Sequence, residues 1–260
     1  MILGRFPSPA LFSRPEAAGI LQKFVPVAKA IRKGNLAAFK RALGPESGNE
    51  RWFFKKGILL PLLHRCEVLV WRSLARRVFL LTYQFPTDPN TRKAPTLDLA
   101  DLTAAAEYCQ KSLEGWQKPV DAVTAMQSGR VHTNSLFMKV PDLVPPAQGR
   151  KKLVAHEGII FGNRVPDLVQ VEAIVASLVQ QGLLHGFISH SQGKFAILGS
   201  KQRGGPLNAG FPSVWEALKE RAVNEGRDAE IPGWVRGERK GGMGGVVNLS
   251  GIARPVGSGG

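Results

Sequence analysis

The sequence predicts a mainly α-helical fold, and three features of the chain support this prediction. Residues 15–82 carry apolar side chains at helical spacing in successive segments that are joined by very short connections. Residues 97–113 repeat this pattern after a proline-rich stretch. Residues 169–181 have one apolar face and are followed at once by two short β-prone runs. Together these features predict a series of helices with a small β-hairpin after them.

The first helices form closely connected pairs. Pro15 suits the first position of a helix, and Gly34 is expected to end that helix. Only two residues separate it from the next helix, residues 36–43, so the two must pack as an αα-hairpin. Residues 51–82 then predict a further helical pair. Stacked pairs of this kind form a small solenoid, because each pair buries the apolar faces of its neighbours.

The segment after residue 168 predicts a helix followed by a tight hairpin. Gly182 stands where the left-handed residue after a helix is expected. Phe187 and Ile188 belong to one β-prone run, residues 195–198 form the next, and residues 191–193 supply the turn. A helix followed by a hairpin is the closing half of a winged helix, in which the hairpin is the wing. An unrelated α+β fragment fits this pattern equally well.

Changes in composition divide the chain into parts. Residues 85–95 are rich in Pro, Asp, Asn and Thr, which is typical of a linker. Residues 213–223 predict one short helix in an end that is otherwise rich in Gly. We assign residues 1–84 to a helical-repeat part, 96–200 to a winged-helix part, 115–163 within it to an insertion that is mobile at least in part, and 201–260 to a basic, Gly-rich, mostly disordered tail.

The chain is strongly basic, with 35 Lys and Arg against 20 Asp and Glu and a formal net charge of +15. Such an excess favours polyanionic partners, namely nucleic acid, an acidic protein or an anionic membrane, and an ordinary solvated basic surface is the plainer alternative. The most apolar run, residues 57–63, is too short to span a bilayer. The first three residues resemble the end of an interrupted element, so we expect the chain to begin inside a longer helical protein.

No residue pattern indicates an enzyme. The closest pair of histidines, His185 and His190, has no Asp or Glu in its segment to complete a metal site. His64 and Cys66 are two residues apart on a predicted helix, so they do not face each other as a catalytic pair would. Cys66 and Cys109 lie in apolar helical contexts, which indicates core residues, no disulfide framework and a reducing compartment. We expect no catalytic residues, no metal and no cofactor.

Several segments resemble the PCI-domain family, which is named after the proteasome lid, the signalosome and translation initiation factor three. They are, in order, MILGRFPSPALF, AIRKGNLAAFKRAL, RWFFKKGILLPLLHRCEVLVWRSLARRVFLL and QGLLHGFISHSQGKFAI. The nearest branch is the mRNA-export subunit of transcription-export complex two, with a signalosome-associated sister form in fungi. The resemblance covers residues 1–114 and 164–202 and leaves the insertion and the tail uncovered.

This resemblance implies a fold, partners and a location. The fold is a helical-repeat (solenoid) bundle fused to a C-terminal winged-helix module, without catalysis. The winged helix would pair side by side with that of a larger PCI scaffold subunit, and a small acidic, largely disordered stabiliser protein would follow the helical repeats. The paired winged helices would present a basic platform to RNA or DNA. The location would be the nucleus, at the nuclear pore, with the cytoplasm as an alternative.

The resemblance and the charge pattern together define candidate site residues. Those for nucleic acid are basic positions on the expected wing and insertion: Lys194, Lys201, Arg203, Arg150, Lys151 and Lys152. Those for partner proteins lie on the long predicted helix and on the first strand of the hairpin: Arg72, Arg76, Arg77, Phe187 and Ile188. Residues 169–181 contain no Lys or Arg, which disfavours base reading in the major groove. Phosphate contacts instead predict weakly specific, salt-sensitive binding.

Two functions fit these features. The first is a non-catalytic scaffold subunit of a nuclear mRNA-export complex that also binds nucleic acid. The second is a structural subunit of a signalosome-like or splicing-associated PCI assembly that has no nucleic-acid site of its own. A stand-alone winged-helix transcription factor is disfavoured, because the helix that would read the DNA lacks basic residues.

Overall fold

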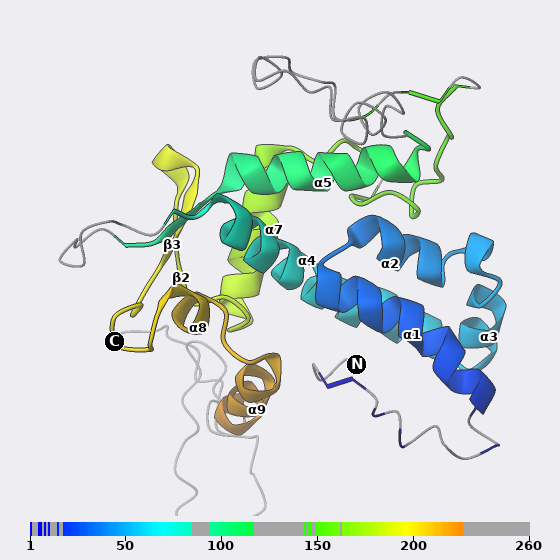
Figure 1. Cartoon of the computed structure of the whole chain (residues 1–260), viewed down its shortest axis with the longest axis horizontal. Helices are drawn as coiled ribbons and strands as arrows, with labels where there is room; N and C mark the ends of the chain where they lie inside the picture. Colours follow the sequence, from blue (N-terminus) through cyan, green and yellow to red (C-terminus); the bar gives the residue numbers. More distant parts are fainter. Residues whose placement is uncertain are drawn as a thin grey trace, which may run out of the picture. The chain divides into compact units, whose positions relative to one another are not determined.

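The computed structural model of the chain describes residues 18–84, 94–116, 149–161 and 163–225, together with residues 1, 5, 6, 8, 10, 15, 143, 145 and 146 (Figure 1). The described residues are mainly helical and include a small three-stranded antiparallel sheet, which confirms the predicted class. Met1–Ala222 make one compact unit, and the description below concerns that unit.

The elements follow one another in chain order. The helices are α1 (Ala18–Lys33), α2 (Leu36–Leu43), α3 (Glu50–Lys55), α4 (Leu59–Thr82), α5 (Leu99–Leu113), α7 (Leu168–Gln180), α8 (Pro206–Gly210) and α9 (Val214–Glu225). Two short 3-10 turns are η3 (Pro45–Ser47) and η5 (His190–Gln192). The strands are β1 (Thr96–Asp98), β2 (Gly186–Ser189) and β3 (Lys194–Ile197).

α1 and α2 form the predicted αα-hairpin, and two residues determine the turn between them. Gly34 has a φ of +64°, and a Cβ there would lie 2.4 Å from the backbone nitrogen of Leu74 in α4. Only glycine therefore lets the turn approach α4 so closely. Asn35 begins α2, because its side-chain oxygen accepts a hydrogen bond from the Ala38 N–H at 2.8 Å.

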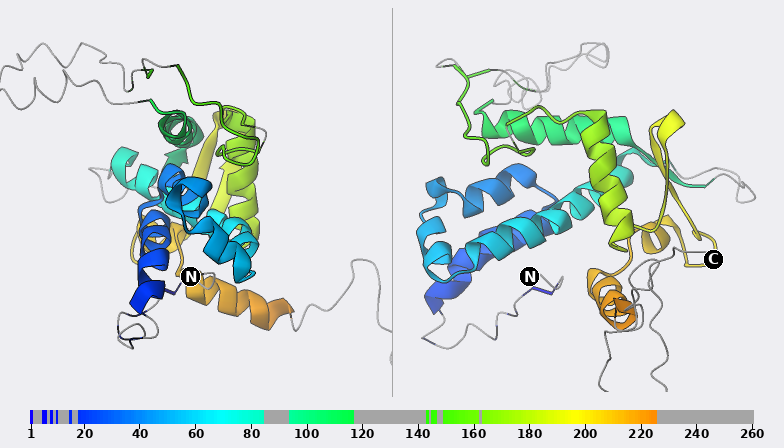
Figure 2. Two further views of the ribbon diagram at one scale, coloured as in Figure 1. Left: turned by 90° about the vertical axis from the view of Figure 1, so that its right-hand side faces the viewer. Right: turned by 180° about the vertical axis from the view of Figure 1, so that it is seen from behind.

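α4 is the central helix of the structure. It packs against α1, α2, α3, α5 and α7, as Figures 1 and 2 show. Its buried side chains are Leu59, Leu62, Cys66, Leu69, Val70, Trp71, Leu74, Ala75, Val78 and Phe79. Phe53 of α3 and Phe24 of α1 extend this core, with ring centroids 5.4 Å apart in an edge-to-face arrangement. One long helix thus connects the first helices with those that follow.

The sheet has the order β1–β3–β2, and both of its ladders are antiparallel. The hairpin of β2 and β3 confirms the prediction, and its turn ends at Gly193, which has a φ of +60°. A Cβ on Gly186 would lie 2.1 Å from the carbonyl oxygen of Ala196, so the close pairing of the strands requires glycine there. Phe195, Ala196 and Ile197 are buried because β3 is the central strand.

β1 is an element that the sequence analysis missed. Its three residues lie where a helix was predicted to begin at residue 97, and they pair with β3 instead. The helix α5 begins two residues later, after Asp98, whose side chain accepts a hydrogen bond from the Ala100 N–H at 2.9 Å. A three-residue strand has no period of its own to detect, so only its partner strand defines it.

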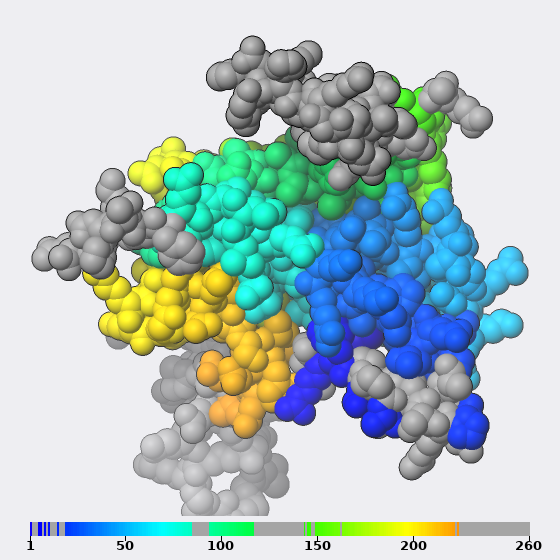
Figure 3. All heavy atoms as spheres, in the orientation of Figure 1, coloured from blue at the N-terminus to red at the C-terminus, as the bar shows by residue number. Residues whose placement is uncertain are grey.

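The described structure continues beyond residue 200, where we placed the start of the tail. α9 matches the short helix predicted at residues 213–223, whereas α8 was not predicted. Phe211, between them, is buried, and its ring lies 5.7 Å from that of Phe79 in α4. In Figure 3 the orange residues of α9 lie directly beside yellow residues that precede them in the chain. Residues 206–222 therefore belong to the folded unit.

The end of the predicted insertion also packs on the core. Ile159 is buried, and its N–H donates a hydrogen bond to Oε1 of Gln110 in α5 at 2.9 Å. Nε2 of Gln110 donates to Oδ1 of Asn163 at 2.5 Å. One buried amide thus attaches residues 159–163 to α5. Most other residues of the predicted insertion lie outside the described part of the chain. No helix among the described residues is long and apolar enough to cross a membrane.

Candidate protein and nucleic-acid interfaces

α7 has a well-defined start and presents two different faces. Asp167 and Gln170 form a capping box: the Asp167 carboxylate accepts the Gln170 N–H at 2.7 Å, and Oε1 of Gln170 accepts the Asp167 N–H at 3.4 Å. The buried face carries Val171, Val175 and Leu178. The exposed positions are Leu168, Val169, Ala173, Ala176, Ser177 and Gln180. This outer face has no basic residue and is mostly apolar, and Val169 is 72% exposed.

The hairpin is attached to α7 at its turn. Nδ1 of His190 lies 2.9 Å from both carboxylate oxygens of Glu172. Phe187 on β2 is 51% exposed, whereas Ile188 is partly buried and packs against the core. β2 is an edge strand of the sheet, so one side of its backbone is unpaired within it. Of the two predicted partner residues on this strand, Phe187 is the one available at the surface.

The predicted nucleic-acid residues of the hairpin lie at opposite ends of β3. Lys194 is half-buried beside the turn and is paired in the sheet with Ser189 and Asp98. Lys201 and Arg203 are exposed in the turn that follows the strand, where the Arg203 N–H donates to the Gly199 carbonyl at 3.0 Å. The three side chains therefore do not form one compact cluster.

The three predicted residues on the insertion lie at the other end of α5. The Leu99 N–H at the start of α5 donates to the Gly193 carbonyl of the hairpin turn at 2.9 Å. The Lys151 N–H donates to the Glu114 carbonyl, just after α5 ends, at 3.0 Å. Because α5 has 15 residues, about 22 Å separates the two places. Within this chain the predicted residues therefore lie in separate places, and a basic platform formed together with a paired winged helix stays a prediction.

The three arginines on α4 have different surroundings. Nη2 of Arg72 donates to the carbonyls of Phe211 and Pro212 at 3.0 and 2.5 Å, and burial lowers the pKa of this guanidinium to about 10, with a smaller effect from the charge of Arg76. Arg77 is exposed, and its Nη1 donates to the Lys33 carbonyl at the end of α1 at 3.3 Å. Arg76 is exposed as well. We correct the partner assignment of Arg72, because this side chain bonds within the chain.

Other basic residues lie beside residues 150–152, and the sequence analysis did not select them. Lys111 and Arg150 both lie over the ring of Trp116, and Arg41 binds the carbonyl oxygen of Ser112. Arg41 and Arg150 are far in the sequence from Lys111 and Trp116. A tryptophan close to several cations is typical of nucleic-acid-binding surfaces, but here only the fold brings these residues together.

Comparison with known proteins assigns the family. No family model matches the chain. The chain is 34% identical over 231 residues, 89% of its length, to a PCI domain-containing protein of Schizosaccharomyces pombe.

The chain belongs to the PCI-domain family. PCI-domain proteins are in general non-catalytic scaffold subunits. The alignment covers 37% of the length of the fission yeast relative, so this chain spans little more than a third of that protein.

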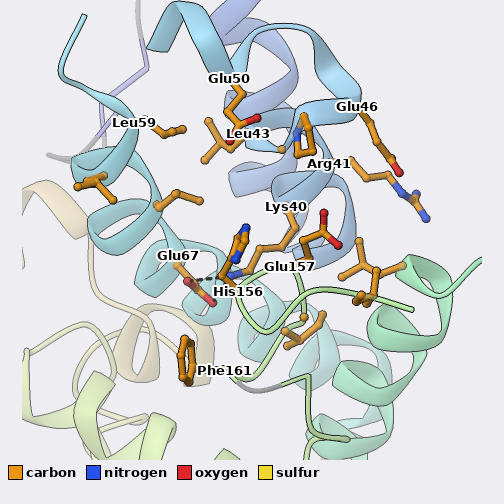
Figure 4. A pocket seen from close by; sticks show the side chains of 18 of the residues that line it. Lys40, Arg41, Leu43, Glu46, Glu50, Leu59, Glu67, His156, Glu157 and Phe161 are labelled. Carbon is orange, nitrogen blue, oxygen red and sulfur yellow. Dashed lines mark hydrogen bonds and ion pairs between the residues drawn. The ribbon is translucent and has the colours of Figure 1, made fainter. Parts of the chain in front are cut away.

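A pocket of this PCI-domain chain lies between α2, α4 and residues 153–161 (Figure 4). Its volume is about 590 Å³, and leucines 43, 59 and 63 and Ile159 contribute to its lining. Lys40 and Glu67, at its wall, pair with each other at 3.3 Å. Lys151 pairs with Glu46 at its edge and holds the pKa of that carboxyl below its ordinary value. The pocket offers apolar volume with paired charges at its wall.

The two cysteines of this PCI-domain chain are buried, and burial affects the reactivity of both. Cys66 is fully buried in the core, as predicted, and burial raises the pKa of its thiol to about 11. Burial also raises the pKa of the Cys109 thiol. Thiols of this kind are poor nucleophiles, because the thiolate is the reactive form. Within the described ranges, no three His, Cys, Asp or Glu side chains lie close enough together to hold a metal ion.

Proposed function

We propose that this chain is a non-catalytic scaffold subunit of a nuclear mRNA-export complex that couples transcription to export. In this proposal α1–α4 form the helical-repeat part of a PCI domain, and β1, α5, α7, β2 and β3 form its winged helix. Membership of the PCI-domain family supports this, as does the order of the elements: a strand, two helices and a hairpin whose second strand pairs with the first. α7 occupies the position of the helix that reads DNA in other winged helices.

The outer surface of α7 and β2 is the observation that carries this proposal. The two elements contact each other, and Leu168, Val169 and Phe187 are 42%, 72% and 51% exposed. Large exposed apolar side chains on neighbouring elements are typical of protein interfaces. A helix with no basic residue on its outer face suits a protein partner better than the phosphates of DNA. The partner we propose is the winged helix of a larger PCI subunit.

Co-purification with a larger PCI subunit tests this pairing. The double substitution Val169→Asp with Phe187→Asp places two carboxylates in the proposed interface, and we expect at least a tenfold loss of affinity. Phe54→Asp on α3, where Phe54 is 71% exposed, is the matched control and leaves pairing unchanged. Equal pairing by the double variant and the native chain would contradict the proposed interface.

Nucleic-acid binding is the second part of the proposal. The net charge of +15 supports it, and we assign phosphate contacts to Lys194, Lys201 and Arg203. Binding to RNA or DNA is then weak in specificity and falls steeply with salt. Reversing the three residues to Glu in the reconstituted complex reduces RNA affinity and the salt slope while the complex still assembles.

A small acidic, largely disordered stabiliser protein is the further partner that we propose. It would bind along α1–α4, where Arg76 is exposed.

A structural subunit of a signalosome-like or splicing-associated PCI complex is the second candidate function. The separation of the described candidate residues favours it, since Lys194, Lys201 and Arg203 lie near the hairpin and residues 150–152 lie at the other end of α5. In that case the chain pairs through α7 and β2 as above, and the reversal of Lys194, Lys201 and Arg203 leaves RNA affinity unchanged. The same reversal therefore distinguishes the two functions.

Nuclear localisation belongs to the first proposed function. Fluorescence microscopy of the tagged chain tests it.

A further inference from the structure

The C-terminal end of α5 holds a tryptophan ring in a defined position. Gly115 has a φ of +91° and ends the helix in a Schellman motif, in which the Trp116 N–H donates to the Lys111 carbonyl at 3.1 Å and the Gly115 N–H to the Ser112 carbonyl at 3.4 Å. The indole Nε1 donates to Oε2 of Glu114 at 3.2 Å. Backbone and ring are therefore both bonded to the last turn of the helix, so the ring is pre-organised.

Cations surround this ring. The Arg150 guanidinium carbon lies 4.9 Å from the ring centroid and the Lys111 ammonium 5.7 Å from it. Lys151 and Lys152 follow in the chain and are exposed. Arg41 of α2 reaches the same helix end, where it binds the carbonyl and the hydroxyl oxygen of Ser112. Five basic residues thus lie around the end of α5. Two carboxylates lie there as well: Glu46 binds Lys151, and Glu114 binds the indole of Trp116.

The negative end of the helix dipole explains only part of this arrangement. Arg41 binds a terminal carbonyl, and Lys151 pairs with Glu46 and joins its own backbone to Glu114. Arg150 and Lys152 are exposed, and Arg150 contacts an aromatic ring instead of a carbonyl. A guanidinium over an indole ring is not required to end a helix. It is the chemistry with which proteins bind unpaired bases.

We propose that Trp116, Arg150, Lys111 and Lys152 form a binding site for single-stranded nucleic acid. A base stacks on the Trp116–Arg150 pair, and Lys111 and Lys152 contact the neighbouring phosphates. The site lies about 22 Å along α5 from the hairpin turn, so one strand that follows α5 can reach both places. This inference rests on the proposed nucleic-acid binding and locates a second contact outside the winged helix. A segment made of Asp and Glu alone has no aromatic ring to stack on the indole.

Binding of a labelled single-stranded oligouridine to the full chain, measured by fluorescence anisotropy, tests the site. Trp116→Leu removes the stacking surface, and we expect affinity to fall about 5- to 100-fold. Trp116→Phe keeps an aromatic face and retains affinity within a few fold of the native chain. Lys111→Glu with Lys152→Glu lowers affinity and reduces the salt slope by about 1.4, the amount expected for two phosphate contacts to a single strand. Lys29→Glu with Lys33→Glu, two exposed positions on α1, is the matched charge reversal and has a smaller effect.

The outcomes separate this site from the function on which it rests. Loss of binding in Trp116→Leu, with retention in Trp116→Phe and unchanged thermal unfolding of both, supports the site. If reversal of Lys194, Lys201 and Arg203 lowers affinity and Trp116→Leu does not, the site is overturned and the proposed function stands. If the native chain does not bind oligouridine, the site is overturned, whereas the proposed function is decided by pairing and RNA binding of the reconstituted complex. A last outcome is that poly-glutamate displaces the oligouridine and that Trp116→Leu leaves the affinities for poly-glutamate and for oligouridine unchanged. The surface then binds polyanions in general, which also overturns the site.

Discussion

The two ends of α5 differ in the surface that they present. At its N-terminal end, the hairpin and α7 expose Leu168, Val169 and Phe187, and α7 has no Lys or Arg. At its C-terminal end, Arg150 and Lys111 lie over Trp116. One helix of 15 residues thus separates an apolar surface from a basic and aromatic one. A net charge of +15 therefore says little about where a basic protein binds its partners, because that depends on how the charge is distributed.

Gly186→Ala should disrupt the hairpin at the N-terminal end of α5 and leave the C-terminal end intact. We expect it to lower the free energy of unfolding more than the three changes that follow. The new Cβ would lie 2.1 Å from the Ala196 carbonyl oxygen, so β2 must move away from β3. We expect the free energy of unfolding to fall by about 3 kcal/mol, measured by urea denaturation. Gly19→Ala is the control, because neither Gly19 nor Gly186 has a positive φ and a Cβ on Gly19 would meet no atom within 4 Å. An equal loss in the two variants would mean that the contact with β3 does not cause the effect.

Gln110→Leu should disrupt the structure at the C-terminal end of α5 by removing hydrogen bonds. The substitution leaves the buried Ile159 N–H without its acceptor and removes the bond to Asn163. We expect a loss of about 2 kcal/mol and faster hydrogen exchange at residues 157–163, with the hairpin unaffected. Leu is similar to Gln in size, so the loss comes from hydrogen bonding more than from a cavity. Unchanged exchange at these residues would contradict the role assigned to Gln110.

Cys109 reports on the middle of α5, between the two ends. The side chain is 8% exposed, and burial raises the pKa of its thiol. We expect the native chain to resist a thiol reagent at pH 8 and to react at both Cys66 and Cys109 after denaturation. Cys109→Ala should cost about 1 kcal/mol, because it leaves a small cavity. Rapid labelling of Cys109 in the native chain would mean that α5 separates from α2 and α4.

The pair of Lys151 and Glu46 should have the smallest effect. Lys151, by its hydrogen bond and its charge, lowers the pKa of Glu46 in the folded state, so the folded chain binds a proton there less readily than the unfolded chain. The pair therefore stabilises the fold above the ordinary pKa of 4.5, and this contribution is lost as the pH falls through the lowered value. Both side chains are exposed, so Lys151→Met should cost less than about 1 kcal/mol at pH 7. The difference from the native chain should vanish in acid, as thermal unfolding against pH would measure.

Much of the fold was predictable because its signals are local. The αα-hairpin follows from Gly34 and the two-residue connection, and the β-hairpin follows from its two β-prone runs and Gly193. β1 was not predictable, because three residues become a strand only when they pair with β3. The candidate sites were harder to predict. Phe187 lies at the surface as a partner residue should, whereas Arg72 bonds to carbonyls 139 and 140 residues away.

The sequence by itself determined the helices, the hairpin, the resemblance to the PCI-domain family and the excess of positive charge, since each depends on composition or on residues close together in the chain. Only the tertiary structure decided which charges lie together and which are used within the fold. Arg41, Lys111, Trp116 and Arg150 meet at one end of α5 because α2, α5 and residues 149–152 pack there. Contacts between distant residues depend on packing, and no local pattern in the sequence reports them.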